Sequence, residues 1–239
     1  MKLALAQTQP VTGNIEANVL THIRVCERAV NDGADAIVFS ELSLTGYEPA
    51  LARMLAVEIN DKRLLPLQKL SDKFSVVIAA GIPVKTDNGA QISLLIFQPK
   101  QEIRNYGKQF LHPDEEQRFV SGKNLEPISI KGVKVGFAIC YELAVHQHFE
   151  TVKSLNPNVY VASVAKFERG IEPAHIRLAA IARNGLPALM VNAIGPADDG
   201  ICAGQSAVWN GAGKKLIELP ADETGILMYD TVSMKAWKV

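Results

Sequence analysis

Short apolar segments alternate with longer amphipathic ones along the chain. The apolar segments have the length of buried strands, and the first of them are Leu3–Thr8, Ala36–Phe39 and Val76–Ile82. Two intervening stretches, Asn14–Asn31 and Asp61–Phe74, carry apolar residues at helical spacing, and Asn14 is a suitable N-cap. This alternation predicts strands that are covered by helices.

The remaining segments mix tight turns with a further helix. The turn Asn210-Gly211-Ala212-Gly213 is typical of a hairpin. Pro173–Arg183 is predicted as a helix with Ile176, Ala179, Ala180 and Arg183 in its periodicity. Because hairpins and crossovers both occur, we predict a layered α/β (α+β) protein with mixed sheets. No repeat or linker divides it, so residues 1–239 are expected to form a single domain. The other predicted strands are Gln91–Gln98, Glu102–Asn105, Ile128–Ile130, Val133–Ile139, Asn158–Ser163, Ala188–Asn192, Gln205–Trp209, Lys215–Glu218 and Gly225–Tyr229.

The charge and cysteine content narrow the class of protein. Lys and Arg equal Asp and Glu at 25 each among 239 residues, so no basic surface points to nucleic acid. No apolar run reaches the length of about 18 residues that a membrane span needs, and Met1–Gln7 is too short for a signal peptide. Cys26, Cys140 and Cys202 form no C-x-x-C pair, which argues against disulfides or zinc and favours the cytoplasm. Cys26 is expected in the core and Cys202 in a flexible loop.

One cysteine stands at a position suited to chemistry. Val133–Ile139 reads as a strand that ends on Cys140, and Leu143–Leu155 reads as the start of a helix. Backbone N–H groups and a helix dipole at such a corner favour a thiolate and can form an oxyanion hole. We therefore expect Cys140 to be a nucleophile whose thiolate is stabilised.

A cysteine nucleophile needs a base and a positive group near the oxyanion. His146 and His148 are close in sequence, but a helix would carry them away from Cys140. Glu41 follows a buried strand, where partial desolvation suits a carboxylate to proton transfer, although a surface glutamate is an equal alternative. Lys108 could stabilise an oxyanion, against the favoured alternative of a solvated loop lysine.

Three segments in this order resemble the nitrilase superfamily of carbon–nitrogen hydrolases. The motifs are E-L-x-L-T-G-Y-x-P from Glu41, K-x-x-L-x-P-x-E from Lys108 and G-x-x-I-C-Y-E around Cys140. Two later segments, Asn192–Gly195 and Gly204–Gly213, also fit the pattern. The resemblance covers the chain from Leu3 to Tyr229.

The resemblance implies a fold and a mechanism. The fold is a four-layer α-β-β-α sandwich with two mixed β-sheets, usually paired as a homodimer or larger homo-oligomer. Glu41 is the general base, Cys140 the nucleophile and Lys108 the oxyanion stabiliser, and the backbone N–H of Tyr141 is a second donor. The chemistry is attack on an amide or nitrile carbon, loss of ammonia or an amine, and hydrolysis of the covalent intermediate, with no metal or organic cofactor.

The family also suggests residues around the three central ones. Many members carry a further active-site glutamate in the lysine loop, for which Glu115 is the candidate and Glu116 the alternative. Tyr47, Tyr141 and Phe167 are candidate walls of a substrate pocket, with ordinary core or rim packing as the competing interpretation.

The substrate stays open at this point. Leu143–His148 replaces the frequent Arg-Phe-Pro of the family, and Phe110 stands where histidine is frequent. A small amide is the first expectation, ahead of a nitrile or an N-carbamoyl compound. Two other classes are a silent relative that binds a metabolite and a metal-dependent phosphodiesterase. A substrate carboxylate could pair with Arg118, Lys166 or Arg183, although surface salt bridges are the favoured alternative for each.

Overall fold

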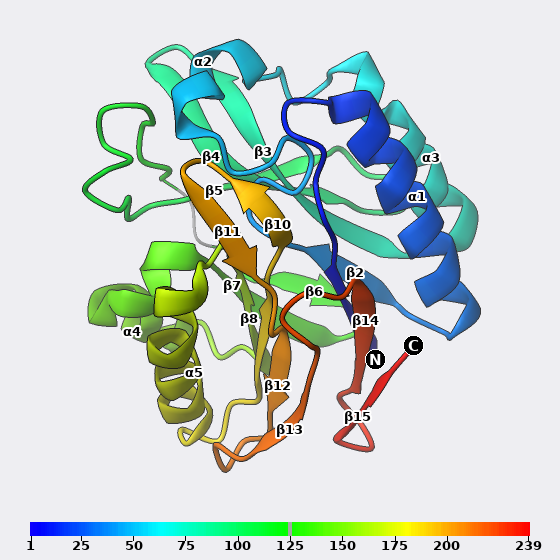
Figure 1. The fold of residues 1–239 in the computed structure, drawn as a ribbon. Coiled ribbons are helices and arrows are strands. Elements are labelled where there is room, and N and C mark those ends of the chain that lie inside the picture. Colours follow the sequence, from blue (N-terminus) through cyan, green and yellow to red (C-terminus); the bar gives the residue numbers. More distant parts are fainter. Residues whose placement is uncertain (124–125) are drawn as a thin grey trace.

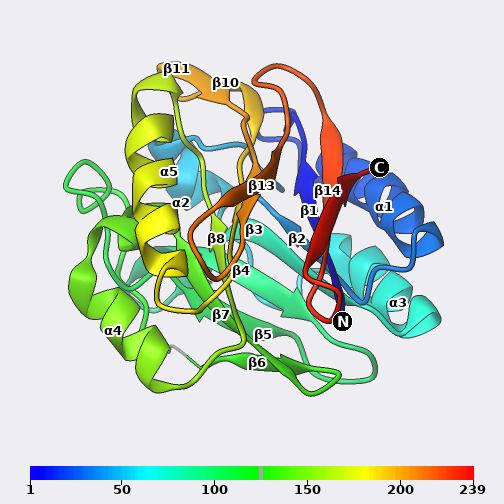
Figure 2. The same cartoon turned by 90° about the horizontal axis from the view of Figure 1, so that it is seen from below.

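Two β-sheets lie face to face with helices on their outer sides in the computed structural model, which describes residues 1–123 and 126–239 (Figures 1 and 2). The first sheet has the order β15-β14-β1-β2-β3-β4-β5 and the second has the order β13-β12-β9-β8-β7-β6. Both are mixed, because parallel central strands are flanked by antiparallel ones. The predicted four-layer α-β-β-α architecture is confirmed.

The strands of each sheet come from distant parts of the chain. The first sheet contains β1 (Lys2–Gln7), β2 (Ala36–Phe39), β3 (Val77–Thr86), β4 (Gly89–Phe97), β5 (Arg104–Gly107), β14 (Gly225–Asp230) and β15 (Lys235–Lys238). The second contains β6 (Ile128–Ile130), β7 (Val133–Ile139), β8 (Val159–Ser163), β9 (Ala188–Val191), β12 (Ala207–Trp209) and β13 (Lys215–Glu218). A separate hairpin is formed by β10 (Ile194–Ala197) and β11 (Gly200–Ala203).

The side-chain alternation of the strands explains the layers. In β1, Leu3 and Leu5 belong to the core between the two sheets, whereas Ala4 and Ala6 belong to the core beneath the helices. All four are fully buried, so this strand is apolar on both faces.

The helices cover both outer faces. The first sheet is covered by α1 (Ile15–Asn31) and α3 (Leu65–Phe74), and the second by α4 (His146–Ser154) and α5 (Glu168–Ala182) (Figure 2). The side chain of Asn14 caps α1 by accepting from the Ala17 N–H at 3.0 Å, as predicted. The short helical turns are η1 (Pro49–Leu51), α2 (Ala52–Leu55), η2 (Lys62–Leu64) and η3 (Cys140–Ala144).

The sequence placed one helix face wrongly. The prediction began this helix at Pro173, but α5 begins at Glu168, and Pro173 lies inside it. Its buried face contains Ile171 and Leu178, whereas Ile176 is 62% exposed. Proline usually marks a helix start because it lacks an amide hydrogen, and here that signal shifted the expected periodicity.

The expectation of a flexible loop around Cys202 was also wrong. Cys202 lies in β11, pairs with Gly195 of β10 and is 2% exposed. The Gly and Pro residues of this hairpin resemble loop punctuation, and its short strands lie outside the two main sheets. Cys26 lies on the inner face of α1 and is fully buried, as expected.

No helix within the described residues is long and apolar enough to cross a membrane.

The loop after β2 is held against β3 by a close backbone contact. Gly81 in β3 donates its N–H to the Ser43 hydroxyl at 3.2 Å, and its carbonyl accepts from the Leu44 N–H at 2.9 Å. A Cβ at position 81 would lie 2.3 Å from the Leu42 nitrogen and 2.9 Å from the Glu41 carbonyl carbon. Only glycine therefore allows this approach, which fixes the backbone at Glu41.

Replacing Gly81 tests this contact. We expect Gly81→Ala to lower the free energy of unfolding by about 3 kcal/mol, because an added methyl group meets backbone atoms that cannot rotate away. Urea unfolding measures the change. Gly132→Ala is the control, because no atom lies within 4 Å of a Cβ there and its cost is about 1 kcal/mol of left-handed backbone strain. Equal costs at the two positions would contradict the account.

Candidate active site

The ends of strands from both sheets bring together the residues singled out in the sequence. Glu41 follows β2 and Lys108 follows β5 in the first sheet, while Cys140 follows β7 in the opposite sheet. All three are buried, and Cys140 also lines a pocket. The solvated alternatives for Glu41 and Lys108 are thereby excluded.

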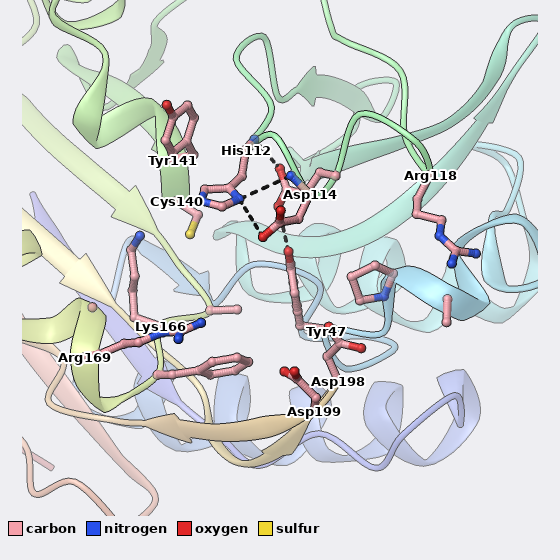
Figure 3. Close-up of a pocket in the computed structure, with 16 residues that line it drawn as sticks. Tyr47, His112, Asp114, Arg118, Cys140, Tyr141, Lys166, Arg169, Asp198 and Asp199 are labelled. Carbon is pink, nitrogen blue, oxygen red and sulfur yellow. Dashed lines mark hydrogen bonds and ion pairs between the residues drawn. The ribbon is translucent and has the colours of Figure 1, made fainter.

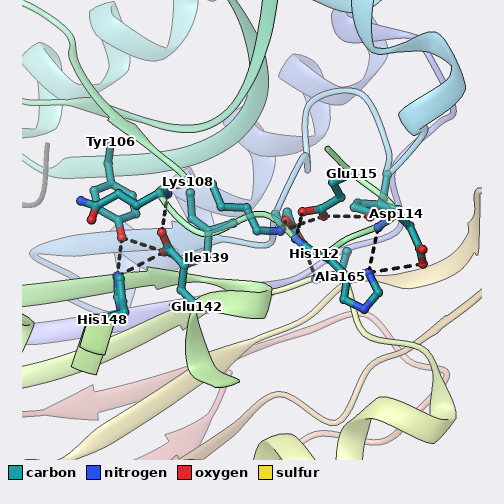
Figure 4. Close-up of polar contacts among 12 residues, drawn as sticks. Tyr106, Lys108, His112, Asp114, Glu115, Ile139, Glu142, His148 and Ala165 are labelled. Carbon is teal, nitrogen blue, oxygen red and sulfur yellow. Dashed lines mark hydrogen bonds and ion pairs between the residues drawn. The ribbon is translucent and has the colours of Figure 1, made fainter. Parts of the chain in front are cut away.

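Lys108 is held between two carboxylates. Its Nζ donates to Glu41 Oε1 and to Glu115 Oε1, each at 2.8 Å (Figure 4). The second oxygen of Glu41 accepts from the backbone N–H of Ala165 at 3.1 Å. The side chains of Lys108 and Glu41 are fully shielded from solvent. These contacts fix the positions of both charged groups.

Glu115, and not Glu116, is the glutamate of this cluster. Glu115 is 1% exposed, while Glu116 lies on the surface. Its carboxylate also accepts from the Tyr47 hydroxyl at 2.9 Å and from the His112 N–H at 2.8 Å. The lysine loop is therefore folded around this one side chain.

Cys140 has a strained backbone and faces a pocket of about 450 Å³ (Figure 3). Its φ angle is 45°, in the left-handed region that non-glycine residues rarely adopt. Such strain concentrates at functional sites, where a sharp strand-to-helix turn exposes a nucleophile. The pocket has the size of a site for a small molecule.

Burial and the carboxylate of Glu41 disfavour the thiolate form of Cys140. Burial and the neighbouring Glu41 raise the pKa of Cys140 to about 11. Burial also raises the pKa of Glu41, while Lys108 opposes that rise. Although burial alone would lower the pKa of Lys108, the carboxylate of Glu41 holds it above its usual range, so the ammonium stays charged.

The predicted thiolate and helix were therefore wrong in detail. Cys140 begins only the short turn η3, and α4 starts at His146 instead of Leu143. One turn has a weak dipole, so burial and the negative charge of Glu41 decide the state of the thiol. His148 is not available to Cys140, as expected, because it bonds with the Tyr106 hydroxyl at 2.9 Å. His146 is exposed at the start of α4.

Glu142 has a bridging role that was not predicted from the sequence. This fully buried carboxylate accepts from the Ile139 N–H at 2.7 Å and from the Gln109 N–H at 2.6 Å. The hydroxyl of Tyr106 donates to it at 2.7 Å (Figure 4). Glu142 thus links the strand end before Cys140 to the residue after Lys108. Its place in the C-Y-E motif is the feature of the sequence that could have pointed to this role.

Aromatic side chains form part of the pocket lining. Tyr47, Tyr141 and Phe167 all line the pocket, and Tyr141 meets the His112 ring edge-on with 5.0 Å between ring centroids. Of the basic residues considered for a substrate carboxylate, Arg118 and Lys166 line it. Arg183 does not, because it caps the far end of α5. Arg169, which the sequence analysis did not name, is a further lining residue.

Within the described residues, no group of three or more His, Cys, Asp or Glu side chains is arranged to hold a metal ion.

Comparison with known proteins places the chain in a family. The family model for carbon–nitrogen hydrolases matches residues 2–238. The chain belongs to the carbon–nitrogen hydrolase family.

Curated relatives include an amidase and several synthetases. An (R)-stereoselective amidase from a Pseudomonas species is 27% identical over 228 residues, covering 93% of this chain and 82% of that protein. A glutamine-dependent NAD(+) synthetase from Acinetobacter baylyi is also 27% identical, over 229 residues, covering 92% of this chain. The chain spans 42% of the length of that synthetase.

Solved structures share the fold. An amidase from Nesterenkonia sp. AN1, with acrylamide added to its active-site cysteine, superposes with a TM-score of 0.86 at 22% identity and covers 96% of this chain and 92% of that one. A glutamine-dependent NAD(+) synthetase from Acinetobacter baumannii gives 0.84 at 24% identity and covers the whole of this chain and 47% of that one.

The charge balance around Cys140 can be tested by titration. We expect Glu41→Gln to lower the Cys140 pKa from about 11, because the carboxylate that disfavours the thiolate is removed. The ultraviolet absorbance of the thiolate, followed against pH, measures the shift, and subtracting the titration of a Cys140→Ala protein isolates this residue. An unchanged or higher pKa in Glu41→Gln would show that Glu41 does not act on the thiol.

Proposed function

We propose that this chain is a cysteine hydrolase of small amides, with Cys140 as nucleophile, Glu41 as general base and Lys108 as oxyanion stabiliser. The observation that carries the proposal is the buried Glu41–Lys108–Glu115 cluster beside Cys140. The amidase relative favours amides over nitriles and N-carbamoyl compounds, which use the same three groups and stay alternatives. Because every group that the reaction needs is present, a silent metabolite-binding relative is disfavoured.

Acylation follows from the protonated thiol. As Cys140 Sγ attacks the carbonyl carbon, its proton passes to Glu41, and the carbonyl π electrons move to the oxygen. Lys108 spends two of its three N–H donors on carboxylates, so the third is free for the oxyanion. The backbone N–H of Tyr141 is the second proposed donor. Collapse breaks the C–N bond, and the leaving ammonia or amine takes the proton from Glu41.

Deacylation uses the same groups. Water attacks the thioester carbon and gives one proton to Glu41, and the restored oxyanion meets the same donors. When the C–S bond breaks, Glu41 returns its proton to Cys140, and a carboxylic acid leaves. Glu115 acts by holding Lys108 and the Tyr47 hydroxyl in place. Tyr47, Tyr141 and Phe167 are the proposed contacts of the substrate.

The cellular compartment and the oligomeric state stay predictions. A reducing compartment such as the cytoplasm suits a reaction that requires a free thiol at Cys140. A groove between α4 and α5, lined in part by Leu143, Val145, Phe149 and Ile181, supports a homodimer.

Replacement of the nucleophile is the main test. In an ammonia-release screen over small amides, nitriles and carbamoyl compounds, we expect Cys140→Ala to lower kcat by at least about 10³-fold. Cys202→Ala is the matched control, because this buried cysteine is not among the pocket-lining residues. It should keep its activity. Turnover by Cys140→Ala near the wild-type rate would refute the proposed nucleophile.

Removal of metal separates the proposal from a phosphodiesterase. We expect amide hydrolysis to continue at an unchanged rate after dialysis against EDTA, since the proposed steps use only protein groups and water. The metal content of the dialysed protein serves as the control. A loss of activity that returns with added metal would favour the metal-dependent alternative.

A further inference from the structure

Lys166 is a second lysine near Cys140 that the proposed mechanism does not use. It follows β8 and lines the pocket, and its side chain extends toward Cys140 (Figure 3). Within the described ranges 1–123 and 126–239, no carboxylate forms an ion pair with Lys166 or with Arg169. Lys108, in contrast, is already committed to Glu41 and Glu115.

The backbone of Lys166 is fixed from several sides. Its N–H donates to Asn192 Oδ1 at 2.8 Å, and its carbonyl accepts from Asn192 Nδ2 at 3.0 Å. The same carbonyl accepts from the Ala203 N–H at 2.9 Å. Asn192 is fully buried, so the protein around it holds its amide in place. The backbone from which the Lys166 side chain extends is therefore held in place.

The stem of Lys166 is also supported. It packs over Gly170 in α5, where an added Cβ would lie 3.0 Å from Lys166 Cδ. The positive charge of Lys166 opposes the rise in the Cys140 pKa more strongly than the charge of Lys108 does. Lys166 is half-buried, and its side chain extends toward the thiol (Figure 3).

We propose that Lys166, assisted by Arg169, binds a carboxylate carried by the acyl part of the substrate amide. This inference rests on the proposed amide hydrolysis and names its substrate class. A half-buried ammonium without an ionic partner gains a charge-assisted hydrogen bond when an anion arrives. Hydrolysis itself gives Lys166 no other role, because Lys108 and a backbone N–H already serve the oxyanion.

The other charges of the pocket orient such a substrate. Asp198 and Asp199 line a different part of the pocket from Lys166 and would repel a carboxylate (Figure 3). Arg118 lies close enough to Asp198 to oppose the rise in the Asp198 pKa, so its charge is partly balanced. The carboxylate of a bound amide is therefore directed to the Lys166 side.

Matched amides test the proposal. Glutaramate and pentanamide have the same chain length, but only glutaramate carries a carboxylate, and glutamine is a second carboxylate amide. We expect the wild-type protein to prefer both carboxylate amides over pentanamide in kcat/KM. In Lys166→Met this preference should fall by about 10- to 100-fold, the range of a hydrogen bond to a charged group. Lys166→Arg should retain most of it.

Two controls keep the result interpretable. Lys214→Met removes an exposed lysine in the β12–β13 turn and should leave the preference unchanged. Calorimetric titration of glutaramate into Cys140→Ala and Cys140→Ala/Lys166→Met measures binding without turnover, and we expect Kd to rise by the same factor. An unchanged preference and an unchanged Kd would overturn the role of Lys166 while amide hydrolysis stands. A shifted Kd without any turnover would instead overturn the proposed hydrolysis.

Discussion

The buried ion cluster of Lys108 with Glu41 and Glu115 is the interaction on which the site depends. Placing a single ammonium in a protein interior costs several kcal/mol, and here two carboxylates offset that cost at 2.8 Å each. The cluster carries two negative charges and one positive charge, so its net charge is negative. Burial, together with the carboxylate of Glu41, disfavours a thiolate beside it and raises the pKa of Cys140 to about 11. Burial also raises the pKa of Glu41 while Lys108 opposes that rise, so the thiol stands next to a carboxylate that is suited to take up its proton.

The fold brings this cluster together at the ends of strands. Glu41 is fixed by the contact of its loop with Gly81, and Lys108 is tied to the opposite sheet through Gln109 and Glu142. Glu142 also holds the last residue of β7, directly before Cys140. One buried carboxylate thus connects the segment after β5 with the end of β7, and these two strands belong to different sheets. The arrangement explains how groups far apart in sequence meet within hydrogen-bonding distance.

Local patterns were sufficient for some of this structure and insufficient for the rest. The strand that ends at Cys140 and the helix capped by Asn14 follow from apolar spacing and residue type, and both are confirmed. The motif resemblance selected Glu41 and Lys108, which composition and spacing could not separate from surface residues. The state of the Cys140 thiol depends on a carboxylate 99 positions earlier in the numbering, and local sequence does not contain that information.

The same limit applies to the pocket. Along the chain, a surface salt bridge is the favoured interpretation of Lys166 and no motif singles out Arg169. Only the meeting of β8, α5 and the β10–β11 hairpin shows that both residues line one cavity. The substrate is therefore a question of tertiary placement more than of motif.

Trapping the covalent intermediate tests the central claim most directly. An amide that the protein hydrolyses is mixed with it, and the reaction is quenched in acid during turnover. The acyl group of the amide should then be found on the peptide that contains Cys140. Mass spectrometry of the digested protein detects the added mass and its position. The account predicts a thioester on Cys140. Turnover with an acyl group on another residue, and with Cys140 unmodified, would contradict it.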